Sequence, residues 1–210
     1  MLVFRIFVLM KVLNRKSEIL KVAKDLITEK GYNAVSMRDL AKALDIKAAS
    51  LYNHIANKQE ILSTIILEIA EAFTVGMTQI FNKETTAIKK LQDLIGLHID
   101  ISINNSGAMA MMHNDWKHLE ADELIRFVTL RNAYENNFRT IIKQGVNQGE
   151  IINKNPEVIV FSMLSTLQTM YLWYEKRGKM DVNILKTDMV SVLLDGIRTL
   201  ISCGKNLENC

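Results

Sequence analysis

Apolar residues recur at helical spacing along almost the whole chain. Between residues 17 and 30, Ile19, Ala23 and Ile27 repeat every fourth position, which predicts an amphipathic helix. Further helices are predicted by the same pattern over 58–82, 85–104, 107–119, 121–148, 156–177 and 182–203. Two shorter helices are expected between residues 36 and 54, and no segment reads as a convincing strand. We therefore predict an all-α fold of about nine helices.

The segment 31–62 predicts two short helices around a tight turn, followed at once by the start of a third. Gly31 can end the preceding helix, because glycine adopts the left-handed conformation without a Cβ clash. Ser36 is expected to cap the next helix, with Asp39 in the capping-box position. Asp45 marks the turn, and aspartate tolerates a left-handed conformation better than most residues. Asn57 is expected to cap the helix that begins at Lys58.

The short helix over 47–54 is the candidate for entry into the major groove of DNA. We expect Ala49, Leu51 and Ile55 to face inward and the remaining positions to face outward. Tyrosine, histidine and lysine donors suit phosphate oxygens, whereas small polar groups reach base edges and an alanine contacts a thymine methyl. The predicted DNA contacts are Ser36, Lys47, Ala48, Ser50, Tyr52, Asn53, His54 and Lys58. The alternative is that these are a helix cap and ordinary surface side chains without a ligand.

Residues 15–62 resemble the N-terminal DNA-binding domain of the TetR/AcrR family of one-component transcriptional regulators. The resemblance rests on Leu51-Tyr52-Asn53-His54-Ile55 with Lys58 and Leu62, preceded by Gly31-Tyr32, Ser36 and Leu40-Ala41. It implies a three-helix helix-turn-helix domain joined to a C-terminal helical domain for ligand binding and dimerisation. Asp45 stands where the family usually has glycine, and Lys47 stands where serine commonly caps. These departures bear on individual DNA contacts.

The domain organisation expected from these patterns has four parts. Residues 1–14 form an N-terminal extension, in which Met10 is a candidate translation start, and residues 15–62 form the helix-turn-helix domain. Residues 63–203 form the ligand-binding and dimerisation domain, and 204–210 form a polar tail. The apolar run at the N-terminus is short and broken by Arg5 and Lys11, so we expect no membrane span.

Charge and cysteine content narrow the class of protein. The chain is 49% hydrophobic and 23% charged, as is ordinary for a globular protein. Residues 11–60 carry ten Lys or Arg against six Asp or Glu, so the basic surplus falls on the proposed DNA-binding domain. The surplus suits a dimer bound at a specific site better than a protein that coats nucleic acid. Cys203 and Cys210 lie near the C-terminus, which favours a reducing, cytoplasmic setting.

The last two long helices carry more apolar side chains than we expect one subunit to bury. One has Val158, Phe161, Leu164, Tyr171 and Leu172 along it, and the other has Leu185, Met189, Val192, Leu193, Gly196 and Leu200. We expect this surface to pair with its copy in a second subunit as a four-helix dimer interface. Such a homodimer would present two recognition helices about 34–36 Å apart to a palindromic operator in double-stranded DNA.

Methionine and aromatic residues in the C-terminal half could line a cavity for a hydrophobic small-molecule effector, or fill an ordinary core. From Trp116-Lys117-His118-Leu119 through Arg131-x-x-Tyr134 to Leu172-Trp173-Tyr174, this half also resembles the branch of the family that responds to acyl-CoA thioesters. That resemblance implies a repressor released by an acyl-CoA, with Trp173 and Arg177 beside the CoA moiety. The candidate effector-binding residues are Trp116, Phe127, Tyr134, Met170, Trp173, Tyr174 and Arg177.

Two other readings use the histidines. A metal- or haem-responsive regulator of the same fold, or a metal-dependent helical enzyme, would use His98, His113, His118 and Asp115. His113 and His118 are five residues apart, and that spacing does not put two ligands on one helix face as an i, i+4 pair does. The chain also has no nucleophile elbow or phosphate loop. We therefore expect no catalytic residue, no metal and no cofactor.

Overall fold

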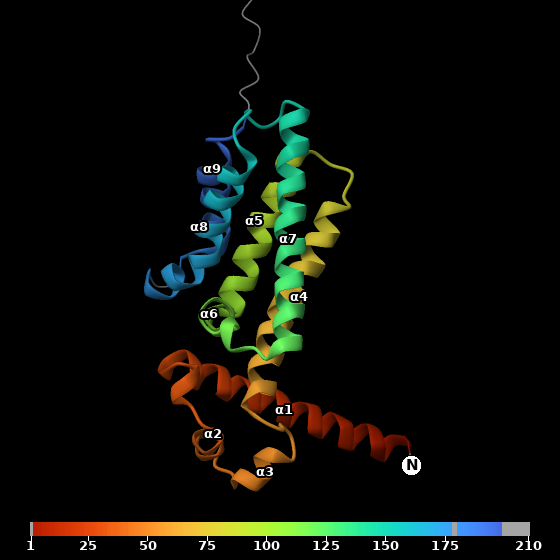
Figure 1. The fold of residues 1–210 in the computed structure, drawn as a ribbon, viewed down its shortest axis with the longest axis vertical. Helices are drawn as coiled ribbons and strands as arrows, with labels where there is room; N and C mark the ends of the chain where they lie inside the picture. Colours follow the sequence, from red (N-terminus) through yellow and green to blue (C-terminus); the bar gives the residue numbers. More distant parts are fainter. Residues whose placement is uncertain (1, 178–179, 199–210) are drawn as a thin grey trace, which may run out of the picture.

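The computed structural model describes residues 2–177 and 180–198, with side chains from residue 15 onward. Its helical elements, in chain order, are α1 Leu2–Lys30, η1 Tyr32–Ala34, α2 Met37–Ala43, α3 Ala48–Tyr52, α4 Lys58–Phe81, α5 Ala87–Asn104, α6 Ser106–Asn114, η2 Trp116–His118, α7 Ala121–Asn147, α8 Pro156–Arg177 and α9 Val182–Leu194, where η marks a 3₁₀ turn. Figure 1 shows α1–α3 gathered at one end of the molecule, with α4 leading from them into the bundle of α5–α9. The predicted all-α fold is confirmed.

Three helix boundaries differ from those predicted. Helix α1 begins at Leu2, so the expected N-terminal extension continues the first helix instead of preceding it. The expected helix over 107–119 is divided at Asp115 into α6 and η2. Helix α9 ends at Leu194, and Ile152 N–H then donates to the Ile197 carbonyl at 2.9 Å, a tertiary contact that the local sequence does not encode. The predicted tail, both cysteines and Leu200 lie outside the described residues.

The predicted caps and turn of the N-terminal domain are confirmed. The Ser36 hydroxyl accepts from the Asp39 amide at 3.2 Å, and the Asp39 carboxylate accepts from the Ser36 amide at 2.9 Å. The hydrogen bonds from Ser36 lower the pKa of Asp39, because they favour its charged form. Asp45 has a φ of 52°, in the left-handed region. The Asn57 carboxamide accepts from the Glu60 amide at 2.7 Å, which caps α4.

The core of this domain decides which side of α3 faces outward. Leu51 and Ile55 are fully buried, together with residues of α1 and α2. Ala48 is partly buried and packs on the same core, whereas Ala49 is exposed. The expectation that Ala49 faces inward is therefore wrong. The inward positions are 48, 51 and 55, which follow helical spacing, and position 49 lies about 100° away from position 48.

Helix α4 joins the two halves of the molecule. Near the start of α4, the Glu60 carboxylate pairs with the ammonium of Lys16 in α1 at 2.6 Å. This ion pair connects α4 to the first domain. Further along, α4 packs against α5, α6 and α7. Within the part of the chain that the structure describes, α4 alone is long and apolar enough to cross a membrane, with a mean hydropathy of 1.5. Half of that stretch is buried inside the bundle, which accounts for its apolar character.

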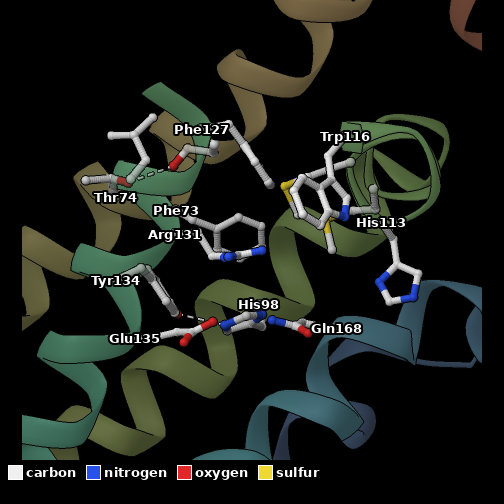
Figure 2. Close-up of a pocket in the computed structure, with 14 residues that line it drawn as sticks. Phe73, Thr74, His98, His113, Trp116, Phe127, Arg131, Tyr134, Glu135 and Gln168 are labelled. Atoms are coloured by element: carbon white, nitrogen blue, oxygen red, sulfur yellow. Dashed lines mark hydrogen bonds between the residues drawn. The ribbon is translucent and has the colours of Figure 1, made fainter. Parts of the chain in front are cut away.

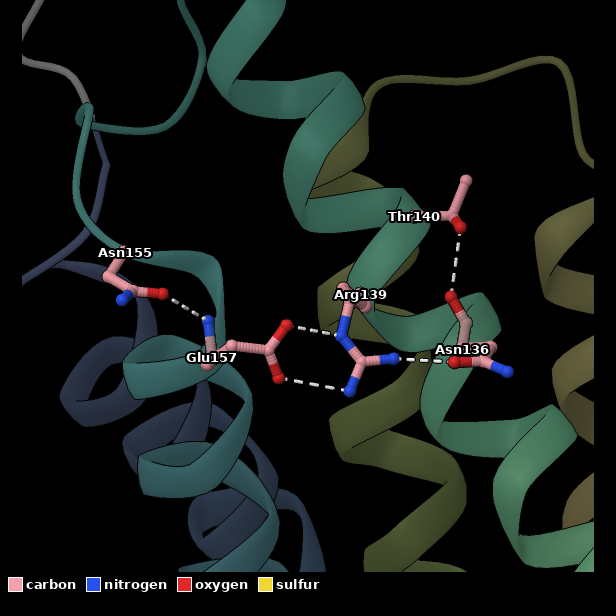
Figure 3. Close-up of polar contacts among 5 residues, drawn as sticks. All are labelled: Asn136, Arg139, Thr140, Asn155 and Glu157. Atoms are coloured by element: carbon pink, nitrogen blue, oxygen red, sulfur yellow. Dashed lines mark hydrogen bonds and ion pairs between the residues drawn. The ribbon is translucent and has the colours of Figure 1, made fainter.

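A bidentate ion pair holds the start of α8 against α7 (Figure 3). Arg139 donates through Nε to one carboxylate oxygen of Glu157 at 2.5 Å and through Nη2 to the other at 3.0 Å. The third donor, Nη1, reaches the Asn136 side chain at 2.6 Å. Asn155 caps α8 by accepting from the Glu157 amide at 2.9 Å. The hydrogen bonds from the Arg139 guanidinium lower the pKa of Glu157, because they favour the charged carboxylate.

Candidate DNA-binding surface and effector cavity

The outward side of α3 gathers most of the predicted DNA contacts on one surface. Lys47, Ser50 and Asn53 are exposed, and the Tyr52 side chain is 52% exposed. His54 is only partly buried, although its Nδ1 is buried and has no partner among the described residues. Figure 1 shows α3 at the end of the molecule farthest from α5–α9. A surface at this end can approach a DNA duplex without obstruction by the C-terminal bundle.

Lys58 is placed differently from the other predicted contacts. Its ammonium donates to the Tyr32 carbonyl at 2.6 Å and to the Val35 carbonyl at 2.8 Å. It also lies 4.0 Å from the centre of the Tyr32 ring. Burial lowers the pKa of Lys58, an effect that the nearby Asp115 carboxylate opposes. In this structure Lys58 therefore fastens α4 to η1, and its contact with phosphate stays a prediction.

Ser36 is likewise engaged within the domain. Its hydroxyl donates to the Asp39 carboxylate at 2.6 Å as well as accepting from the Asp39 amide. The bond from the Asp39 amide belongs to the capping box of α2, and the bond to the carboxylate adds to it. A direct contact between Ser36 and DNA stays a prediction, and the cap alone explains the presence of serine at this position.

A cavity of about 270 Å³ lies among α4, α5, α6 and α7, with α8 and η2 contributing to its wall. Three of the candidate effector residues line it: Trp116, Phe127 and Tyr134. The remaining apolar wall consists of Ala70, Phe73, Met109, Met112 and Leu130. The other polar residues in the wall are Thr74, His98, His113, Arg131, Glu135 and Gln168 (Figure 2). Apolar and aromatic residues thus form the larger part of the wall, and polar side chains from five elements interrupt it.

Four of the candidate effector residues do not line this cavity. Met170 is buried in the core, and Trp173 is 41% exposed. Arg177 is exposed at the end of α8, and the Tyr174 hydroxyl donates to the Met180 carbonyl at 3.3 Å. The expected position of Trp173 and Arg177 beside the CoA moiety stays a prediction, but neither residue lines this cavity. The physical reason is the rotation of α8, which turns Gln168 toward the cavity and these later residues away from it.

Several residues of the cavity wall are not among the candidates predicted from sequence. Arg131, Tyr134 and Glu135 lie at i, i+3 and i+4 on α7, so they share one helix face. That spacing could have indicated Arg131 and Glu135 once Tyr134 was chosen. Phe73 and Gln168 had no such local signal, because they come from α4 and α8 and meet the others only in the folded bundle.

A hydrogen-bonded pair of buried side chains lies in the cavity wall. The Nε2 atom of His98 is 2.7 Å from the Tyr134 hydroxyl, and the Phe73 ring centre lies 4.6 Å from that of His98. Burial lowers the pKa of His98 to about 3 and raises the pKa of Tyr134, since both charged forms lose hydration. Both side chains are therefore neutral near pH 7. Nδ1 of His98 is buried and has no hydrogen-bond partner within residues 15–177 and 180–198.

The short helix η2 contacts both the cavity and the N-terminal domain. Trp116 lines the cavity, where its ring centre lies 5.7 Å from that of Phe127 and 5.1 Å from the Arg131 guanidinium. Two residues later, the His118 ring stacks on Tyr32 at 5.3 Å. The Gln59 side chain donates to the His118 carbonyl at 2.5 Å. One turn of chain thus joins the cavity wall to η1 and to the first turn of α4.

The structure does not gather the histidines into a metal site. His98 is bonded to Tyr134, whereas His118 stacks on Tyr32 at the junction of the domains. Over residues 2–177 and 180–198, no group of three His, Cys, Asp or Glu side chains is arranged to hold a metal ion. The geometry of these residues therefore favours neither the metal-responsive regulator nor the metal-dependent enzyme.

Comparison with known proteins matches both halves of the chain to one family. Residues 19–65 match bacterial regulatory proteins of the tetR family, and residues 84–197 match the tetracyclin repressor-like C-terminal domain. A curated relative, the HTH-type transcriptional repressor KstR2 of Rhodococcus jostii, is 24% identical over 185 residues, which cover 87% of this chain and 91% of that protein.

The solved structures that share the fold include KstR2 and AibR. The ketosteroid transcriptional regulator KstR2 of Mycobacterium tuberculosis has a TM-score of 0.82 at 18% identity, covering 88% of this chain and 95% of that one. AibR, in complex with isovaleryl coenzyme A and operator DNA, has a TM-score of 0.73 at 23% identity, covering 85% and 97%. Family membership places the chain among transcriptional regulators and not among enzymes. The chain belongs to the TetR family of transcriptional regulators.

Proposed function

We propose that this protein is a homodimeric repressor that binds a palindromic operator and releases it when a small hydrophobic effector enters the cavity. The observation that carries the proposal is the position of η2. Trp116 forms part of the cavity wall, and His118 rests on Tyr32 of the DNA-binding domain. An effector that displaces Trp116 would change the packing of η2 against η1 and α4, and so shift the population toward dimers misaligned for DNA.

Exposed apolar residues on α8 and α9 support the dimer. Phe161 is 71% exposed and Val192 is 76% exposed, and Val158, Leu172 and Ile184 are also exposed. Large exposed apolar side chains on α8 and α9 cost free energy in water unless a partner covers them. A copy of the same two helices is the partner that twofold symmetry supplies. Leu164, Tyr171 and Leu185 are buried within the subunit and do not belong to this interface.

The proposed effector is an acyl-CoA thioester, of which the acyl group enters the cavity. A volume of about 270 Å³ is slightly below the range of about 300–1,000 Å³ that is common for small-molecule sites. It suits a short acyl group, and the CoA moiety would then remain outside. The AibR complex with isovaleryl coenzyme A and operator DNA supports this ligand class on the same fold. An operator-binding role implies that the protein acts in the cytoplasm.

The test is release of operator DNA. An operator is first selected from a random DNA library with the full-length protein, and binding is then followed by fluorescence anisotropy while isovaleryl-CoA or free CoA is added. We expect isovaleryl-CoA to release the DNA and free CoA to have no effect. Tyr52→Ala should weaken binding to every DNA sequence, whereas Asn132→Ala, at an exposed site on α7, should not. Unchanged operator affinity in Tyr52→Ala would contradict the proposed DNA-binding surface.

A further inference from the structure

The buried pair of His98 and Tyr134 fixes the position of a proton. Among the described residues, the Tyr134 hydroxyl has one hydrogen-bond partner, Nε2 of His98. A buried phenol proton without an acceptor costs free energy, so this proton points to Nε2. A neutral imidazole carries one proton, and with Nε2 as acceptor that proton is on Nδ1. His98 therefore presents an N–H donor at Nδ1.

That donor is unpaired in this structure. Nδ1 of His98 is shielded from solvent and has no partner among the residues that the structure describes, although buried polar groups in proteins are nearly always hydrogen-bonded. The ring lines the cavity, as does Gln168 of α8, and Figure 2 shows His98, Tyr134 and Gln168 at one end of the view with Trp116 and Phe127 at the other. Gln168 makes no hydrogen bond with the described residues, so its side chain is free to move aside for a ligand.

The surroundings of this donor favour an uncharged ligand group. Arg131 and Glu135 also line the cavity one turn apart on α7, so these two residues bring one positive and one negative charge to the wall. The rest of the wall is mainly apolar, so an ion placed beside His98 would lose hydration without a net countercharge. A carbonyl oxygen accepts a hydrogen bond, carries no charge and has no proton that needs an acceptor. It matches a single N–H donor in an apolar wall.

We propose that Nδ1–H of His98, held in this tautomer by Tyr134, donates a hydrogen bond to the carbonyl oxygen of the effector's acyl group. This inference rests on the proposed effector function and specifies the chemistry that the cavity recognises. The cavity would therefore bind compact apolar acyl groups that carry an uncharged carbonyl, as in a short thioester. His98 recognises the carbonyl oxygen of the ligand, and the volume of the cavity limits the length of the ligand's acyl chain.

Two probes that differ only at the carbonyl test the proposal. Hexanoyl-CoA contains the thioester carbonyl, whereas S-hexyl-CoA has a methylene group in its place. Calorimetric titration of the full-length protein should show tighter binding of hexanoyl-CoA, by about tenfold, because the thioether leaves the His98 donor unpaired. In His98→Phe the two probes should bind equally. In His98→Asn the preference should persist, since the asparagine amide places an N–H near the position of Nδ1.

Further controls keep the result decisive. Tyr134→Phe keeps the ring but removes the hydroxyl that selects the tautomer, so we expect its preference for the thioester to fall severalfold. Thermal melting and operator binding report whether each variant is folded. Equal affinity of the two probes for the wild type, the same preference in His98→Phe, or no binding of either probe at millimolar concentration would overturn the inference.

Release of operator DNA, measured in parallel, separates this inference from the proposed function. If both probes release DNA equally well, the repressor function stands and the role of His98 fails. If hexanoyl-CoA binds through His98 without releasing DNA, the role of His98 stands and the proposed release of the operator by the effector fails.

Discussion

Replacement of Lys58 by methionine separates a structural role from a DNA contact. Methionine keeps an unbranched apolar side chain but removes the ammonium that bonds the carbonyls of Tyr32 and Val35. In the variant, both carbonyls lose their donor, and α4 loses its polar link to η1. If these bonds are the main role of Lys58, the variant should be less stable, and its DNA binding per folded dimer should change little.

The structure sets the size of this effect. A hydrogen bond to a charged group contributes about 1.5–3 kcal/mol, and a cation over an aromatic ring adds about 0.5–1 kcal/mol at an exposed site. Lys58 is only partly buried, so water can replace part of what is lost. We therefore expect a loss of about 2 kcal/mol in the free energy of unfolding. For a chain of this length, that corresponds to a melting temperature lower by about 4–8 °C.

Lys47→Met is the matched control. Lys47 is exposed at the N-terminus of α3 and makes no side-chain hydrogen bond with the described residues. Its loss should leave the melting temperature unchanged. If each Lys47 of a dimer contacts one phosphate, the slope of log K against log salt should become shallower by about 2. Calorimetric melting and anisotropy titrations between 50 and 200 mM salt, roughly the range over which phosphate contacts are resolved, measure both quantities.

The opposite pattern would refute the reasoning. If Lys58→Met melts at the wild-type temperature while its salt slope becomes shallower by as much as that of Lys47→Met, the ammonium of Lys58 contacts phosphate. The internal hydrogen bonds would then contribute little.

Two further predictions concern the C-terminal domain. Gly145→Ala should lower the free energy of unfolding by about 1–3 kcal/mol, because the new Cβ would lie 2.6 Å from Ile151 Cδ1 and 2.8 Å from Ala87 Cβ; Gly96→Ala, with nothing within 4 Å, should be neutral or stabilising in the same denaturant titration. His98 has a folded-state pKa of about 3, below the ordinary value of 6.5, so unfolding takes up a proton and stability is lost as the pH falls below 6.5. Between pH 6.5 and 5 this loss should be about 2 kcal/mol, and His98→Asn should lack that part of the pH dependence; parallel pH curves for the two proteins would contradict it.

Much of the N-terminal domain could be predicted from sequence because its determinants are local. The cap at Ser36, the cap at Asn57 and the left-handed turn at Asp45 each depend on residues within about four positions, and all three are present. The exposed side of α3 followed from the apolar positions of one short helix. The prediction that Ala49 faces inward was wrong because Ala48 and Ala49 are both alanine. The apolar pattern therefore does not show which of the two faces the core.

The effector site was only partly predictable, since α8 is apolar on more than one side. Phe161 is exposed, Met163 and Leu167 are buried, and Gln168 lines the cavity. Helical periodicity shows which residues share a side, but it does not show which side meets the core, the cavity or a second subunit. That depends on how α8 packs against α5, α6 and α7. Trp173 was predicted as an effector contact because an indole can cover the CoA moiety, but its side chain lies outside the cavity wall and is partly exposed.

The sequence by itself determined the family, the helices, their caps and the basic charge of the DNA-binding domain, because these depend on residue type and local spacing. Only the tertiary structure decided how long-range partners meet. Lys58 lies 26 residues from the carbonyl of Tyr32, and His98 lies 36 residues from the hydroxyl of Tyr134. Such pairs form when whole helices pack, and the packing of many side chains at once sets their distances.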